Sequence, residues 1–238
     1  MRRIWLLPLV CLLAWGIGCR SRTAEPLTQV TRSPAFHPES LEAVAYFGFS
    51  PGIAPDNVLQ WVEALVGEQL MTVEYPFAVL SRTDVERLTQ TEETRTLVKG
   101  VCNFWKDSRK VDKFELARLC EAVGVQGILV GTIEEWTEAA SARGTTDVPY
   151  TRLAASLEFY SAESGRRTWK ARSAHTIETQ ATQEDYEELR DKTQKGRERL
   201  RAETVQAMHR DHPAPSVESV AATVAEALAK ALVPGGAS

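Results

Sequence analysis

The sequence predicts an α+β fold, with a single mixed β-sheet and helices packed on it. Three observations lead to this prediction. Short, nearly unbroken apolar runs alternate with stretches of helical periodicity in the first half of the chain. Two longer β-like segments then flank Ser164 and Gly165, as in an antiparallel hairpin. An alanine-rich amphipathic helix closes the domain, and this order is typical of single-sheet α+β proteins.

Residues 1–18 are typical of a secretory signal peptide. Arg2 and Arg3 precede an uncharged apolar run, and this run is shorter than the roughly 20 residues that a transmembrane helix needs. The sequence Gly16-Ile17-Gly18-Cys19 resembles the lipobox of bacterial lipoproteins, in which the cysteine is diacylated and becomes the mature N-terminus. Cys19 is therefore the predicted lipidation site. Gly16 departs from the usual leucine, and the alternative is an ordinary signal peptide with an incidental cysteine.

Residues 19–40 are expected to be a flexible tether, because they are polar, contain three prolines and show no periodicity. One globular domain is expected at 41–238. Loss of Arg2 and Arg3 with the signal peptide changes the net charge from −4 to −6. A mildly acidic chain without a basic tract argues against nucleic acid as the main partner.

Three apolar runs are expected to form buried strands, at 44–49, 77–80 and 128–133. Four helices are expected between them. The first starts at Asp56, the second starts at Thr83, the third covers about 97–105 and the fourth covers 112–123. Asp56 is expected to cap the first of these helices, and Thr83 to Glu86 fits a capping box for the second. Gly124 stands where the last helix would stop.

The second half of the domain is expected to begin with a hairpin of residues 152–161 and 166–179. On its second arm, alternation places a set of side chains on one face: Trp169, Ala171, Ser173, His175 and Ile177. Residues 182–212 are dense in charge and are expected to form an exposed helical insertion broken near Gly196. The closing helix is expected at 217–232.

Four of these motifs, in this order, resemble a group of bacterial envelope lipoproteins that includes CsgG, LpoB and the N-terminal domain of TolB. The first is an Ala-Val-x-x-Phe-type strand, here at 44–49, and the second is a strand ending in arginine before a helix, here at 79–88. A helix-turn-strand rich in glycine follows at 116–133, and a Gly turn with a tryptophan-bearing strand at 157–169. The likeness covers about residues 42–180 and the final helix.

Members of this group differ widely in task, so the resemblance alone implies little about function. The lipid tether, the flexible spacer, the compact α+β domain and the lack of catalytic motifs favour a non-enzymatic lipoprotein that regulates or scaffolds another envelope protein, as LpoB does for a peptidoglycan synthase. One alternative is a CsgG-like subunit of a secretion or surface-assembly complex. A CsgG-like pore would need two segments that form membrane hairpins, and the chain offers none. The segment 138–149 is too short and too polar, and the segment 182–212 is too highly charged. The other alternative is an envelope hydrolase with an unrecognised site.

Location and partner are predicted less fully. Arg20 follows the lipidated cysteine in place of an aspartate that retains many lipoproteins in the inner membrane. By this resemblance the protein is expected on the outer membrane, facing the periplasm. The expected partner is an envelope protein of unknown identity, contact with the membrane runs through the lipid, and the oligomeric state is left open.

Candidate catalytic and metal-binding groups are few. His209, Asp211 and His212 could suggest a metal site, but a solvated helix end explains them better, and no metal or other cofactor is predicted. Glu134 and Glu138 could act as paired acids on one face of a strand, with Glu135 on the other. A solvated strand end is the preferred interpretation.

Glycines, tryptophans and cysteines offer the remaining candidates. The glycines at 124, 127 and 131 lack the Gly-Lys-Ser/Thr ending of a phosphate loop, so packing and turn geometry explain them better. The tryptophans at 105, 136 and 169 are equally consistent with contact anchors and with core residues. Cys102 and Cys120 are expected either to form a disulfide or to be buried thiols. No nucleophile motif of the Gly-x-Ser-x-Gly type occurs.

Overall fold

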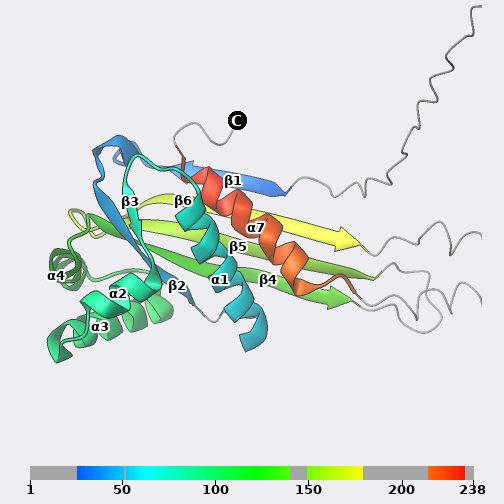
Figure 1. The fold of residues 1–238 in the computed structure, drawn as a ribbon, viewed down its shortest axis with the longest axis horizontal. Coiled ribbons are helices and arrows are strands. Elements are labelled where there is room, and N and C mark those ends of the chain that lie inside the picture. The colour runs from blue at the N-terminus through cyan, green and yellow to red at the C-terminus, as the bar shows by residue number, and fades with distance from the viewer. Residues whose placement is uncertain (1–25, 51, 140–148, 179–213, 234–238) are drawn as a thin grey trace, which may run out of the picture.

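A computed structural model describes residues 26–50, 52–139, 149–178 and 214–233 of the chain. Within them lies one six-stranded mixed sheet with helices packed on it (Figure 1), so the predicted fold class is confirmed. The predicted signal peptide, Cys19, most of the polar segment 138–149 and the charged insertion at 182–212 fall outside the described residues.

Six strands build the sheet: β1 (Leu27–Arg32), β2 (Ala43–Ser50), β3 (Ala78–Leu80), β4 (Gly127–Ala139), β5 (Tyr150–Ser161) and β6 (Arg167–Glu178). Their spatial order is β1-β6-β5-β4-β2-β3. β4, β5, β6 and β1 pair antiparallel, whereas β2 is parallel to both β4 and β3. The hairpin expected on either side of Ser164 and Gly165 is formed by the long strands β5 and β6.

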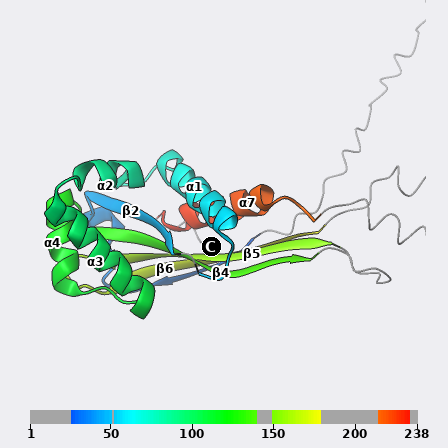
Figure 2. The ribbon, with the colours of Figure 1, turned by 90° about the horizontal axis from the view of Figure 1, so that it is seen from below.

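Helices α1 (Asp56–Thr72) and α7 (Val217–Ala231) lie side by side on one face of the sheet (Figure 2). Their apolar residues recur every three or four positions, so one stripe of each helix is buried against the strands. On α1 the fully buried positions are Val58, Val62, Val66 and Leu70, and on α7 they include Val220, Val224 and Leu228. These helices and the strand residues beneath them form the larger core, and we call this side the helix-covered face.

Helices α2 (Arg82–Leu88), α3 (Glu92–Ser108) and α4 (Lys113–Val123) surround a second core, which they share with side chains of the opposite face of the sheet. These helices gather at one end of the molecule (Figures 1 and 2). The second core contains Val101, Trp105, Leu116 and Leu119 from the helices. Beyond this end, the described residues place no helix over the rest of that face.

The segment expected to be a flexible tether is partly folded, which corrects the boundary at residue 41. β1 pairs along β6 from Leu27 opposite Ala174 to Arg32 opposite Trp169, and a 3-10 turn, η1 (Pro38–Ser40), follows. Phe36 is buried, with its ring centroid 5.4 Å from that of Phe159. The folded body therefore begins at Leu27.

Helix starts were predicted with mixed success. The helix expected at 112–123 is α4, and Asp112 caps it, because its Oδ1 accepts hydrogen bonds from the backbone N–H groups of Phe114 and Glu115. The capping box of α2 is formed by Ser81 and Asp84, two residues earlier than expected. Asp56 lies inside the first turn of α1, and Pro55 occupies the cap position without a side-chain hydrogen bond.

Candidate binding surface on the open face of the sheet

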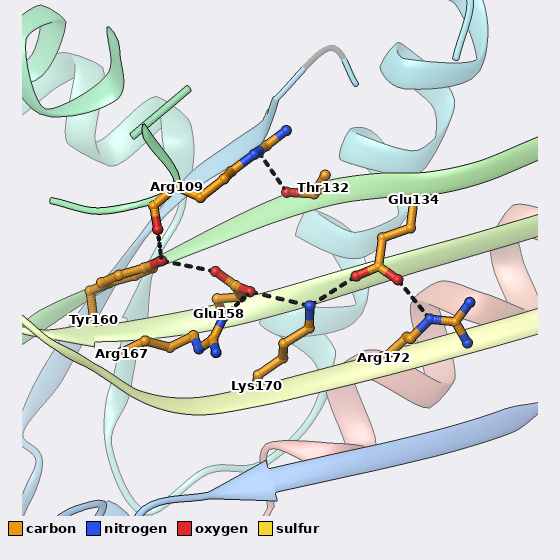
Figure 3. Close-up of polar contacts among 8 residues, drawn as sticks. All are labelled: Arg109, Thr132, Glu134, Glu158, Tyr160, Arg167, Lys170 and Arg172. Atoms are coloured by element: carbon orange, nitrogen blue, oxygen red, sulfur yellow. Dashed lines mark hydrogen bonds and ion pairs between the residues drawn. The ribbon is translucent and has the colours of Figure 1, made fainter. Parts of the chain in front are cut away.

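A cluster of charged side chains lies where the second core meets the part of the sheet that no described helix covers. Figure 3 shows the polar contacts among its members. The cluster draws on the C-terminal end of α3 and on strands β4, β5 and β6, which are far apart in sequence. We call this cluster the charged face; its members are Arg109, Thr132, Glu134, Glu158, Tyr160, Arg167, Lys170 and Arg172.

Strand alternation and register create the charged face. On β6, Lys170 and Arg172 alternate with Trp169 and Ala171, which are buried on the helix-covered face. The pairing of β5 with β6 then sets Glu158 opposite Lys170, with Tyr160 opposite Arg167 and Ser156 opposite Arg172. Acid and base thus meet directly across two antiparallel strands.

Glu158 is the most deeply placed carboxylate of the charged face, with 8% of its side chain exposed. Its Oε1 lies 2.7 Å from Nη1 of Arg167 and 3.3 Å from Nζ of Lys170. Its Oε2 lies 2.9 Å from the hydroxyl of Tyr160. A buried carboxylate needs such partners, because the loss of hydration otherwise makes its charge costly.

Glu134 forms the second anchor of the charged face. Its Oε1 accepts a hydrogen bond of 2.9 Å from Lys170, and its Oε2 accepts one of 2.6 Å from Nε of Arg172. Burial opposes ionisation of Glu134, but hydrogen bonds from Lys170, Arg172 and Ser156 outweigh it and hold the pKa below the usual value. Lys170 bridges the two carboxylates and joins the pairs into one network.

Tyr160 and Arg109 connect the network to helix α3. The Tyr160 hydroxyl lies 3.1 Å from the backbone carbonyl oxygen of Arg109, in addition to its contact with Glu158. Burial, followed by the charge of Glu158, raises the pKa of Tyr160 to about 12. Arg109 ends α3 in a left-handed conformation, donates to Thr132 Oγ1 at 3.0 Å and stacks 5.0 Å from the ring centre of Trp105.

The charged face carries more positive than negative charge. Four basic side chains, those of Arg109, Arg167, Lys170 and Arg172, surround the two carboxylates, so an excess of two positive charges remains. Each guanidinium has five N–H donors, and each arginine here uses only one of its nitrogens in the contacts described. The remaining donors suit carboxylates of a partner, which guanidinium groups bind through paired hydrogen bonds.

The structure corrects the expected arrangement of the acids on β4. A register shift between Ile133 and Glu135 inserts an extra residue into the strand. Glu134 and Glu135 therefore lie on the same face, where Glu135 pairs with Arg152 at 3.1 Å, and Glu138 follows the opposite alternation. Glu134 belongs to an ion-pair network, and a solvated strand end does not describe it.

The other predicted candidates have structural roles. Trp105 and Trp169 are buried and Trp136 packs against the larger core, so the core interpretation of the tryptophans is confirmed. Gly124 ends α4 in the left-handed conformation, and a side chain at residue 127 or 131 would collide with a phenylalanine ring. Packing and turn geometry therefore explain these glycines.

Cys102 and Cys120 carry free thiols, so the structure contains no disulfide between them. Cys120 is buried in the second core, where burial raises its pKa to about 12, and Cys102 is partly buried. The described residues contain no cluster of three or more potential metal ligands. His209, Asp211 and His212 lie outside the described residues. No described helix is long and apolar enough to cross a bilayer.

Two surface hollows lie away from the charged face. One, of about 560 Å³, lies between α1 and the start of α2, where Glu63 pairs with Arg82. The other, of about 500 Å³, lies at the end of the sheet beside Phe36 and the last turn of α4. Core side chains and a local ion pair account for much of their linings, whereas the charged face gathers surplus donors from four separate segments.

Comparisons with known proteins give distant likenesses. No family model matches the chain, and no curated protein is significantly similar to it. The chain is similar to the PelC dodecamer protein from Paraburkholderia phytofirmans, with 10% identity, 87% of this chain and 96% of that chain covered, and a TM-score of 0.44. It is also similar to the lipoprotein GNA1162 from Neisseria meningitidis (12% identity, 65% and 96% covered, TM-score 0.37).

A third similar structure is the LpoB C-terminal domain from Salmonella enterica, with 9% identity, 63% of this chain and 88% of that chain covered, and a TM-score of 0.30. The structural neighbours thus include bacterial lipoproteins, and LpoB is a member of the group that the sequence motifs resemble. At these identities and TM-scores the likenesses carry nothing about the charged face, which rests on its own geometry.

Proposed function

We propose that the mature chain is a lipid-anchored, non-enzymatic protein of the bacterial cell envelope that regulates or scaffolds another envelope protein. The anchor is the lipid on Cys19, and the contact with the partner is made by the charged face. The observation that carries this proposal is the surplus of guanidinium donors on the charged face. The side chains of Arg167 and Arg172 are 47% and 30% exposed, and donors on such side chains are suited to binding acidic groups.

The signal-peptide pattern and the lipobox-like sequence before Cys19 support the envelope location. Residues between the lipid and Leu27 would hold the folded body near a membrane, which raises its effective concentration at a partner fixed in the same envelope. Placement on the outer membrane, facing the periplasm, is proposed from Arg20 after the cysteine.

The proposed contact is tested by affinity capture from detergent extracts of cells that carry variants of the full-length lipoprotein. The variant Arg167→Ala/Arg172→Ala should retain at most about one tenth of the captured partner, because close charge pairs contribute several kcal/mol at interfaces. Capture by the wild type should also weaken as salt is raised, through screening of the exposed charges.

The matched control is Arg87→Ala/Arg118→Ala, which removes two arginines from exposed ion pairs on the helices. It should capture the partner like the wild type. Equal capture by both double variants would contradict the proposed contact. Detergent-stable rings would favour the secretion-complex alternative, and loss of function in a variant that neutralises one acid, with capture intact, would favour the hydrolase.

The anchor is tested by Cys19→Ala. This variant should no longer become lipidated, so it should remain uncleaved by the lipoprotein peptidase and should take up no palmitate analogue. A variant that still takes up the label and stays with the membranes would place the lipid elsewhere.

A further inference from the structure

An acidic stretch follows β6 closely in the chain. Residues 183–191 read Gln-Glu-Asp-Tyr-Glu-Glu-Leu-Arg-Asp, and their five acids and one arginine give a net charge of −4. The next ten residues, 192–201, carry five bases and one acid, so charge of each sign is gathered into its own block. The net charge of the acidic block is thus opposite in sign to that of the charged face.

The acids of this stretch recur at the spacing of one helix face. Glu184, Glu187, Glu188 and Asp191 stand at positions i, i+3, i+4 and i+7. In the helix that the sequence predicts for this region, their carboxylates would form a stripe about 10 Å long. On β6 the bases from Arg167 to Arg172 extend over about 16 Å, so the two charged surfaces have comparable lengths.

The chain also has the reach that this contact needs. Arg172 lies about 20 Å along β6 from Glu178, the last described residue of the strand. The connection from Glu178 to Glu184 can span at most about 20 Å when extended. The acidic stretch can therefore return along the strand from which it leaves and meet the charged face of the same molecule.

We propose that the acidic stretch 183–191 binds the charged face of its own chain and competes there with the acidic partner. The competition rests on the proposed function, whereas the contact itself does not. A segment joined to its site by a short connection acts at an effective concentration in the millimolar range. A partner must displace it, so the stretch sets a threshold for partner binding.

The test uses a fluorescent synthetic peptide of residues 182–192 and the full mature lipoprotein in detergent. Peptide binding is followed by fluorescence anisotropy. A neutralised variant, Glu184→Gln/Glu187→Gln/Glu188→Gln/Asp191→Asn, should bind the peptide at least about tenfold more tightly than the wild type, because its charged face is no longer occupied. Adding Arg167→Ala/Arg172→Ala to this variant should abolish binding, while circular dichroism verifies that it is folded.

The matched control neutralises acids of the same region outside the acidic stretch, as Glu198→Gln/Glu203→Gln/Asp211→Asn. It should bind the peptide as weakly as the wild type does. Equal binding by the wild type and the neutralised variant overturns the proposal, and so does the absence of binding to the neutralised variant. If the wild type binds the peptide weakly at high protein concentration but tightly after dilution, the acidic stretch of a second copy occupies the charged face. This result would overturn the own-chain contact.

The two proposals fail separately. If partner capture depends on Arg167 and Arg172 but the peptide does not distinguish the neutralised variant from the wild type, only the own-chain contact is wrong. If the peptide does distinguish them but capture is indifferent to these arginines, the contact stands, and the proposed partner surface is wrong.

Discussion

Trp169 and Lys170 are neighbours on β6, yet they lie on opposite faces of the sheet. Trp169 is 1% exposed, with its ring 6.2 Å from that of Phe36, within the core that α1 and α7 cover. Lys170 lies on the charged face and pairs with Glu134 and Glu158. The helix-covered face excludes water and supplies stability, while the charged face holds its own groups together by ion pairs.

The largest effect is expected on the helix-covered face. Trp169→Ala should lower the free energy of unfolding by about 3–5 kcal/mol, because it removes a large buried side chain and leaves a cavity. Lys170→Ala, one residue further, should cost about 1 kcal/mol or less, since Arg167 and Arg172 still neutralise the two carboxylates. Urea unfolding of both variants measures the difference, and equal losses would contradict the division between the faces.

A smaller loss of stability is expected at Glu158, the buried carboxylate of the charged face. Glu158→Gln should lower the free energy of unfolding by about 2–3 kcal/mol. The amide keeps one acceptor oxygen, but the negative charge shared by Arg167 and Lys170 is lost, and an NH2 group then faces one of the former donors. Glu135→Gln, in the more exposed pair with Arg152, is the matched control and should cost less than about 1 kcal/mol. A loss from Glu158→Gln as small as that of the control would show that the network contributes little to folding.

The smallest effect concerns pH. His175 is buried on the helix-covered face, its Nε2 has no hydrogen-bond partner among the described residues, and burial lowers its pKa. As pH falls below about 6.5, the unfolded chain therefore binds a proton that the folded state resists, so stability decreases. Relative to His175→Leu, the wild type should lose at most about 1.4 kcal/mol per pH unit between pH 7 and 5. Parallel pH profiles of unfolding for the two proteins would contradict this assignment.

Much of the helix-covered face could be predicted from sequence, because its signals are local. The stripe on α1 and the alternation on β6 each follow from residues within a few positions of one another. β1 was missed because Val30 is its only strongly apolar residue besides the exposed Leu27. An edge strand pairs on one side and needs little apolar surface, so its pattern resembles that of a polar linker.

The charged face could not be predicted in the same way, because it depends on pairings across the sheet. Glu134 meets Lys170 and Arg172 only when β4, β5 and β6 are in register, and these residues are 36 and 38 positions apart. The inserted residue on β4 also reverses the alternation after Ile133. Simple strand alternation therefore predicts the wrong face for Glu135. A single sequence carries no signal for such an irregularity.

The position of β1 gives the molecule a mechanical property. A pull on the chain ahead of Leu27 reaches the folded body through β1, which lies beside β6 over six residue pairs. Hydrogen bonds between antiparallel strands are perpendicular to the strands, so a pull along the strand loads them in shear, together, instead of opening them one at a time. A body hung from a lipid through this strand would resist detachment by tension at the edge of its sheet.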